Sequence, residues 1–300
     1  MKTSVTFTGS GLRMAGILFT PEQPIATPMP AIVIGHPGGG VKEQSPSIYA
    51  ERLARAGFAA FVFDAAYQGE SEGEPRSLEN PFQRAEDVKN AVSYLSTRED
   101  IDPERIGALG ICASGGYVSY AVQTDLRVKA VATVSGTDMG VVMRDGIGDT
   151  QTPQQRQALL RQANAARTAE ARDGKVVRQE WVPHELPEGA PQDLQEVFDF
   201  YRTPRGFHPR AIQPWPVRNL DQMVQYDSWA LIRLIAPRPL LMIIGSEAHT
   251  GYLSRRAIEM AGEPKELFVI DGATHYSLYD QDEHVTPAVA RMVEFFSKNL

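Results

Sequence analysis

The stretch RIGALGICASGGY, residues 105–117, constrains the fold of this 300-residue chain more than any other segment. A short apolar run ends in small residues and the single cysteine, and a helix-like pattern follows. Gly110, Cys112 and Ser114 give a small–x–nucleophile–x–small spacing, which suits a sharp turn because the strand and helix backbones pass close together there. The segment therefore predicts a strand–turn–helix corner with the Cys112 side chain pushed out above a sheet.

Cys112 is the predicted nucleophile. It would sit at a helix N-terminus, where unpaired N–H groups and the helix dipole favour an anion. We therefore expect its thiol to ionise more readily than a free thiol, and the thiolate is the reactive form. The alternative for a lone cysteine is a small buried apolar residue. Ser114 fits the same spacing and is the alternative nucleophile, although a corner at 112 places it in the first helical turn.

Apolar runs alternate with helix-like segments along most of the chain. This alternation predicts βαβ units and a mostly parallel sheet, with the first two strands antiparallel around a Gly-Ser-Gly turn. Residues on loops beyond the carboxyl ends of such strands are expected to form the active site. The predicted strands span residues 5–7, 12–19, 31–35, 58–64, 105–111, 130–134, 239–245 and 266–270.

Residues 138–228 break this alternation, and the segment is too long for a simple loop. We predict a core formed by residues 1–137 and 229–300, with residues 138–228 as a helical cap inserted over the strand ends. The cap would shape the substrate pocket and exclude water from it; a peripheral decoration is the alternative. Tyr201, Arg202 and Phe207 are candidates to line the pocket, where an arginine could bind a carboxylate, or else to form the core of the cap.

A cysteine nucleophile needs a base and an orienting acid. His275 is the predicted base, because it follows the strand at 266–270 on a late loop facing the corner. Glu247 is the predicted acid, since it is the only carboxylate in the loop after the strand at 239–245. Asp138, just beyond the strand at 130–134, is the alternative acid.

The sequence HPGGG at residues 36–40 predicts half of an oxyanion hole, which needs two backbone N–H groups aimed at the developing charge. One donor would be Ala113, the residue after the nucleophile. The other would be Gly38 or Gly39, because Pro37 has no N–H. His36 is expected to hold this loop by hydrogen bonds at the edge of the pocket. No Gly-Lys-Ser/Thr ending follows, which argues against a phosphate-binding loop.

The composition limits the cellular compartment in which we expect the protein and the partners that we expect it to bind. The net charge of −7 provides no basic field for nucleic acid. One cysteine excludes an internal disulfide and suits a reducing compartment. The N-terminus lacks the apolar region of a signal peptide, and no run reaches transmembrane length. We therefore expect a cytoplasmic protein with no nucleic-acid or membrane partner. Pairing of two copies into a homodimer, through the cap or a sheet edge, is left open.

The order of strands, the HPGGG loop, the GICASGG corner and the late GATH resemble the α/β-hydrolase superfamily. Within it, the cysteine corner resembles the dienelactone hydrolase family. The cap and residues 201–210 are similar to a subgroup that includes fungal polyketide transferases and thiohydrolases. The resemblance implies an eight-stranded, mostly parallel sheet, a triad of Cys112, His275 and an acid, and no metal or organic cofactor. Ala248 stands where that family usually has aspartate.

Three functions follow from these residues. The first is a hydrolase that cleaves an ester, lactone or thioester of a small-molecule acyl substrate through a covalent acyl-enzyme. The second is an acyl or polyketide transferase that resolves the same acyl-enzyme with an alcohol or amine. The third is a binding protein that keeps the fold and the pocket without turnover.

Overall fold

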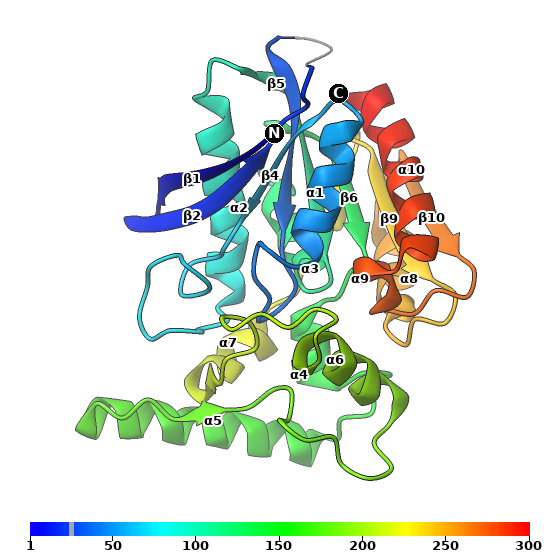
Figure 1. Cartoon of the computed structure of the whole chain (residues 1–300). Helices are drawn as coiled ribbons and strands as arrows, with labels where there is room; N and C mark the ends of the chain where they lie inside the picture. Colours follow the sequence, from blue (N-terminus) through cyan, green and yellow to red (C-terminus); the bar gives the residue numbers. More distant parts are fainter. Residues whose placement is uncertain (24–26) are drawn as a thin grey trace.

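An eight-stranded sheet forms the centre of the molecule in a computed structural model, which describes residues 1–23 and 27–300 (Figure 1). The strand order is β1-β2-β4-β3-β5-β6-β9-β10. The strands are β1 (Lys2–Gly9), β2 (Leu12–Phe19), β3 (Met29–Gly35), β4 (Ala59–Phe63), β5 (Ile101–Ile111), β6 (Val128–Val134), β9 (Leu240–Gly245) and β10 (Lys265–Ile270).

The sheet confirms the sequence-based fold. All eight predicted strands are present, and they are the eight members of this sheet. β1 pairs with β2 and β2 with β4 in antiparallel fashion, whereas the other neighbours are parallel. The central strands are apolar on both faces because helices cover both sides of a parallel sheet. In β3, Ile32 and Ile34 face one core cluster and Ala31 and Val33 face the other.

Helices cover both faces of the sheet (Figure 1). One face packs against α1 (Ser45–Arg55) and α10 (Asp282–Asn299), which also contact each other. The opposite face packs against α2 (Pro81–Ser96), α3 (Ser114–Val122) and α8 (Gly251–Met260). This three-layer arrangement is the α/β architecture that the alternation of strands and helices predicts.

Residues 138–228 lie between β6 and β9 and gather beyond one end of the sheet (Figure 1). This segment contains the helix α5 (Pro153–Asp173), which begins with a capping box between Thr152 and Gln155. The segment also contains α4 (Met139–Asp145), β7 (Arg178–Gln179), α6 (Gln192–Arg202), β8 (Trp215–Pro216), η1 (Val217–Asn219) and α7 (Leu220–Gln225), and η2 (Ile232–Ile235) follows it.

The carboxyl ends of the strands point toward this segment (Figure 1). The loops after β3, β5, β6, β9 and β10 therefore meet in one region, with the short helix α9 (Ser277–Asp280) beside them. Side chains of these loops and of residues 138–228 belong to one buried apolar cluster, which includes Cys112, Val182, Tyr201 and Trp215. Among the helices of the described residues, none is long and apolar enough to cross a membrane.

Candidate active site

Cys112 occupies the predicted corner between β5 and α3. Its φ is +55°, a left-handed conformation that costs energy for a residue with a side chain. The corner is held on both sides, because the Cys112 N–H donates to the Val134 carbonyl at 3.0 Å and its carbonyl accepts from Thr137 N–H at 2.9 Å. A Cβ on Gly110 would lie 2.1 Å from the Ser114 carbonyl oxygen. The strand–turn–helix prediction is thus confirmed, and the small residue before the corner is required by close backbone contact.

The thiol of Cys112 is buried, with a residue exposure of 6%. It hydrogen-bonds the backbone N–H groups of Ala113 and Gly38 and the hydroxyls of Tyr279 and Thr137. Burial raises the pKa of the Cys112 thiol despite these four groups, which act in the opposite direction. The expectation of an easily ionised thiol is therefore wrong for the closed site. The helix start is present, but removing the thiolate from water outweighs it.

In the loop after β3, the two glycines predicted as oxyanion donors, Gly38 and Gly39, have N–H groups that meet different partners. The Gly39 N–H donates to Glu79 Oε2 at 3.3 Å, and its carbonyl accepts from Ile212 N–H at 2.7 Å. The Gly38 N–H faces the Cys112 sulfur instead. Gly38 and Ala113 are therefore the pair available to an oxyanion, and Gly39 holds the loop in place.

A buried ion pair between Arg84 and Glu79 holds this loop in place. The Arg84 and Glu79 side chains are 3% and 0% exposed and join at 2.8 Å. Arg84 also donates to the His36 carbonyl at 2.6 Å and to Ser114 Oγ at 3.0 Å. The His36 ring bonds the Pro37 carbonyl at 2.7 Å and the Ala65 N–H at 3.1 Å, and its Nδ1 also lies 3.4 Å from the Arg84 guanidinium. This network fixes residues 36–40, the predicted oxyanion loop, to the rest of the core.

Ser114, the alternative nucleophile, points into the same network. Its hydroxyl donates to the His36 carbonyl at 2.6 Å and accepts from Arg84. The residue is 2% exposed. The structure therefore places the Ser114 hydroxyl beneath the oxyanion loop and not beside a base. Its position in the first turn of α3 agrees with a corner at residue 112.

His275 lies on the loop after β10, and its two ring nitrogens meet hydroxyl groups. Nδ1 is 2.5 Å from Thr250 Oγ1, and Nε2 is 3.2 Å from the Tyr279 hydroxyl. The residue is 2% exposed. Burial, together with the nearby His249, lowers the pKa of His275 to about 3. The imidazole is therefore neutral at neutral pH and can accept a proton.

Neither predicted acid contacts His275. Glu247 is exposed; its N–H donates to the Ala273 carbonyl, and the Ser246 hydroxyl donates to its carboxylate at 3.4 Å. The loop after β9 turns so that Thr250, and not Glu247, reaches Nδ1 of the histidine.

Asp138 has a different task from the one predicted. It is fully buried and accepts the N–H groups of Gly140, Val141 and Ser228 at 2.7 to 3.1 Å. It caps α4 and joins the two ends of the segment 138–228. Burial raises its pKa to about 6.

Tyr201, Arg202 and Phe207, the pocket candidates in residues 138–228, have three different environments in the structure. Tyr201 in α6 is 3% exposed and belongs to the apolar cluster around Cys112, and its hydroxyl has no hydrogen-bond partner within the described chain. Arg202 bonds the Val182 carbonyl at 2.6 Å and Glu180 at 3.3 Å. Phe207 is 58% exposed. Only Tyr201 therefore lies among the residues of the site.

Two tryptophans, which on sequence grounds could line the pocket or form the core of the cap, cover the loop after β3. Trp181 and Trp215 pack together with ring centroids 4.6 Å apart. A Cβ on Gly38 would lie 3.4 Å from the Trp181 ring, and one on Gly39 would lie 3.4 Å from Trp215 Nε1. Both tryptophans also line a cavity of about 120 Å³ with apolar residues that include Leu159.

Sequence reasoning also missed Thr250 and Tyr279. Tyr279 follows His275 by four residues, a spacing that brings side chains to one face of a helical turn and could have pointed to it. Thr250 lies in the loop after β9, where the predicted acid is a carboxylate. A threonine therefore did not stand out in the sequence. Glu79 comes from the segment between β4 and α2 and Arg84 from the first turn of α2, and nothing in their local sequence indicates that they meet the loop after β3.

One cluster has the donor atoms of a metal site. Carboxylate oxygens of Glu43, Asp64 and Glu70 lie within 4.8 Å of one another. The Lys42 ammonium contacts all three at 2.7 to 2.8 Å, and its side chain is 3% exposed. The lysine thus supplies the positive charge at this cluster.

The depressed pKa of His275 predicts a pH-dependent stability. Below pH 6.5 the unfolded chain binds a proton at this histidine, whereas the folded chain does so only near pH 3. Stability is therefore full above pH 6.5 and falls as the pH drops toward 3. From pH 7.5 to 5.0 the loss is about 2 kcal/mol. Urea unfolding of the natural chain and of His275→Gln at both pH values measures it.

The difference between these two chains isolates the histidine. Asp87 and Asp138, whose pKa values burial raises to about 6, act in the opposite direction between pH 6 and 4, but they are present in both proteins. The stability of the natural chain relative to His275→Gln should fall by about 2 kcal/mol at pH 5.0. Parallel pH profiles for the two chains would contradict a buried neutral histidine.

Comparison with known proteins places this geometry in a family. The protein PA2218 of Pseudomonas aeruginosa is 40% identical over 301 residues, which cover 99% of this chain and 80% of that protein. Its crystal structure superposes with a TM-score of 0.96 at 39% identity, covering 100% of this chain and 94% of that chain. The α/β-hydrolase GrgF from Penicillium sp. sh18 superposes with a TM-score of 0.85 at 21% identity, over 100% of this chain and 99% of that chain.

A named relative is similar at lower identity. The thiohydrolase aneE of Aspergillus aculeatus is 28% identical over 249 residues, which cover 79% of this chain and 74% of that protein. The fold is that of the α/β-hydrolases. The sequence profile of the dienelactone hydrolase family matches residues 14–166, just over half of the chain. By that match and by its similarity to PA2218 over nearly its whole length, the chain belongs to the dienelactone hydrolase family.

Proposed function

We propose that this protein is a hydrolase that cleaves thioesters, esters or lactones of small acyl groups, with Cys112 as nucleophile and His275 as base. One observation carries the proposal: a thiol at a strained strand–helix corner faces two backbone N–H groups, and one hydroxyl separates it from a neutral imidazole. Membership of the dienelactone hydrolase family supports a hydrolase. Similarity to a thiohydrolase supports thioesters within this class.

The residues suggest the following steps. The thiol loses its proton toward His275, and the sulfur attacks the acyl carbonyl carbon. The carbonyl oxygen takes the electron pair and is held by the N–H groups of Ala113 and Gly38. The tetrahedral intermediate collapses, the leaving thiol or alcohol takes the proton from His275, and an acyl-cysteine remains. Water then attacks this acyl group with His275 as base, which releases the acid and restores the thiol.

The charges around the site favour neutral acyl groups. Arg84 is paired with Glu79, Arg202 with Glu180, and Arg205 with Asp280. These three arginines therefore have anionic partners already, and a carboxylate on the acyl group would enter an apolar cluster without compensation. This reasoning departs from the sequence-based idea that Arg202 binds a carboxylate. The cavity beside Trp181 and Trp215 is mainly apolar, although Gln162, Gln179 and Glu180 also line it, and it suits a short aliphatic or aromatic acyl chain.

The burial of the site makes acyl transfer a second candidate function. Cys112 is 6% exposed and His275 is 2% exposed, so the side chains over the site must move before a substrate can reach the sulfur. If they close again over the acyl-enzyme, water is scarce and an alcohol or amine can compete for the acyl group. The same acyl-cysteine then leads to an acyltransferase.

A series of 4-nitrothiophenyl thioesters and 4-nitrophenyl esters tests these functions, because both leaving groups are chromogenic and need no thiol reagent. We expect turnover, with kcat/KM at least about tenfold higher for butyryl than for succinyl substrates, since an uncompensated charge costs more than 1.4 kcal/mol. Product analysis with and without a primary alcohol separates hydrolysis from transfer. Acylation of Cys112 that stops after one equivalent would support the binding protein, and no acylation would exclude all three readings.

A further inference from the structure

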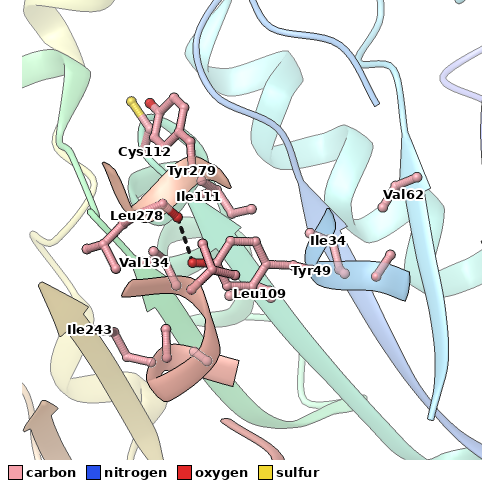
Figure 2. Close-up of a cluster of buried hydrophobic side chains, with 14 of the residues drawn as sticks. Ile34, Tyr49, Val62, Leu109, Ile111, Cys112, Val134, Ile243, Leu278 and Tyr279 are labelled. Carbon is pink, nitrogen blue, oxygen red and sulfur yellow. Dashed lines mark hydrogen bonds between the residues drawn. The ribbon is translucent and has the colours of Figure 1, made fainter. Parts of the chain in front are cut away.

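The hydroxyl of Tyr279 lies between the thiol and the imidazole. Tyr279 belongs to α9, is fully buried, and follows His275 by four residues. Its hydroxyl oxygen is 3.2 Å from His275 Nε2, and on its other side it lies against Cys112, where each group affects the pKa of the other. Figure 2 shows the cysteine sulfur and the tyrosine oxygen beside each other at the end of the apolar cluster. The base therefore meets the nucleophile through a third side chain.

The hydrogen-bond directions along this chain are mutually consistent. With the neutral ring protonated at Nδ1, His275 donates to Thr250 Oγ1, and Nε2 carries the free lone pair. Nε2 then accepts from the Tyr279 O–H, and the tyrosine oxygen accepts from the Cys112 S–H. Each group between Cys112 and Thr250 thus acts once as donor and once as acceptor.

We propose that Tyr279 relays the proton from Cys112 to His275. As the sulfur attacks, the S–H bond breaks and its proton passes to the tyrosine oxygen, while the tyrosine O–H bond breaks and that proton passes to His275 Nε2. The products are a sulfur bonded to the acyl carbon, an intact tyrosine and an imidazolium. The relay rests on the proposed function, because it assigns a step of that reaction to a further catalytic residue.

Two features of the site call for such a relay. Burial favours the neutral forms of both Cys112 and His275, so a resting thiolate–imidazolium pair is disfavoured and the proton has to move during attack. The tyrosine is also held rigidly, because its ring meets Phe200 edge to face at 5.0 Å. A fixed hydroxyl can pass a proton without reorganising its surroundings.

Tyr279→Phe tests the relay, and Tyr49→Phe is its matched control. The Tyr49 hydroxyl donates to the Leu278 carbonyl at 2.7 Å (Figure 2). Both variants therefore delete one buried tyrosine hydroxyl at α9, but only the first deletes the one between the sulfur and the histidine. Because Cys112 is the only cysteine, its alkylation by iodoacetamide can be followed by mass spectrometry as a function of pH. We expect Tyr279→Phe to raise the apparent pKa of alkylation by about one unit and to slow alkylation about tenfold at pH 7.5. Tyr49→Phe should stay within about twofold of the natural chain.

Thioester turnover provides a second readout. Tyr279→Phe should lower kcat about 100-fold with KM changed less than about threefold, because the hydroxyl acts in the proton transfer. An unchanged alkylation profile in Tyr279→Phe would overturn the relay, as would equal losses in Tyr279→Phe and Tyr49→Phe, which indicate a packing role. Alkylation needs no substrate. If the natural chain cleaves none of the test substrates, the proposed function fails while the alkylation profiles still decide the relay.

Discussion

Replacing Cys112 with alanine is expected to lower kcat for thioester cleavage by at least about 1,000-fold, because the variant has no atom that can form the acyl-enzyme. The oxyanion donors Ala113 and Gly38 would remain, and the residual rate would report what they contribute alone. The comparison is made with purified proteins at saturating substrate. The folded state is checked by circular dichroism, since alanine at φ +55° is no more strained than cysteine.

Two further variants identify the nucleophile. Cys112→Ser should lose at least about 100-fold in kcat, because a base whose pKa is about 3 removes a proton from a hydroxyl far less readily than from a thiol. Ser114→Ala should keep kcat within about tenfold, but it should lower stability by about 1–3 kcal/mol through loss of its buried hydrogen bonds to His36 and Arg84. Activity that survives in Cys112→Ala and vanishes in Ser114→Ala would reverse the assignment.

Replacing His275 with alanine is expected to lower kcat by about 100- to 10,000-fold, the range for loss of a general base. The imidazole is the base that we expect to gain a proton when the thiol is deprotonated, and it then gives a proton to the leaving group. Since burial lowers its pKa to about 3, kcat/KM of the natural chain should have no acidic limb near pH 6.5. A pH series from 5 to 8 measures both effects.

His249→Gln and Thr250→Val are the controls for this prediction. His249 packs beside the His275 ring, with centroids 5.5 Å apart, and its replacement should change kcat less than about threefold. Thr250→Val removes the hydroxyl at Nδ1 and should cost about tenfold, the value of one neutral hydrogen bond. Full activity in His275→Ala would exclude histidine as the base. A loss in Thr250→Val as large as in His275→Ala would make the threonine an essential partner.

The third member of the triad is where the sequence-based prediction fails. Glu247 is the only carboxylate in the loop after β9, and strand order correctly indicates that loop. The turn of that loop, however, exposes Glu247 and brings Thr250 to the histidine. A threonine hydroxyl orients the ring but adds little stabilisation to the imidazolium. Burial and the nearby His249 lower the pKa of His275, and the threonine hydroxyl does not offset that shift.

The local sequence pattern was sufficient to predict the strands and the sharp corner at Cys112. Continuous apolar runs determined the central strands, because a parallel sheet covered on both faces has no polar side there. The small residues around Cys112 determined the sharp turn, because close backbone contact excludes larger ones. Both are properties of neighbouring residues, and the sequence contains them in full.

Only the tertiary structure decided which groups surround the thiol. Thr250, in the loop after β9, and Tyr279, in α9, are more than 130 residues away from Cys112 in the sequence. Glu79 reaches the loop after β3 from the segment before α2. The raised pKa of the thiol and the lowered pKa of His275 also come from packing, because desolvation depends on every residue that covers the site. The sequence determined where Cys112, the proposed nucleophile, stands in the chain, and long-range packing determined the direction of its pKa shift and the groups around its thiol.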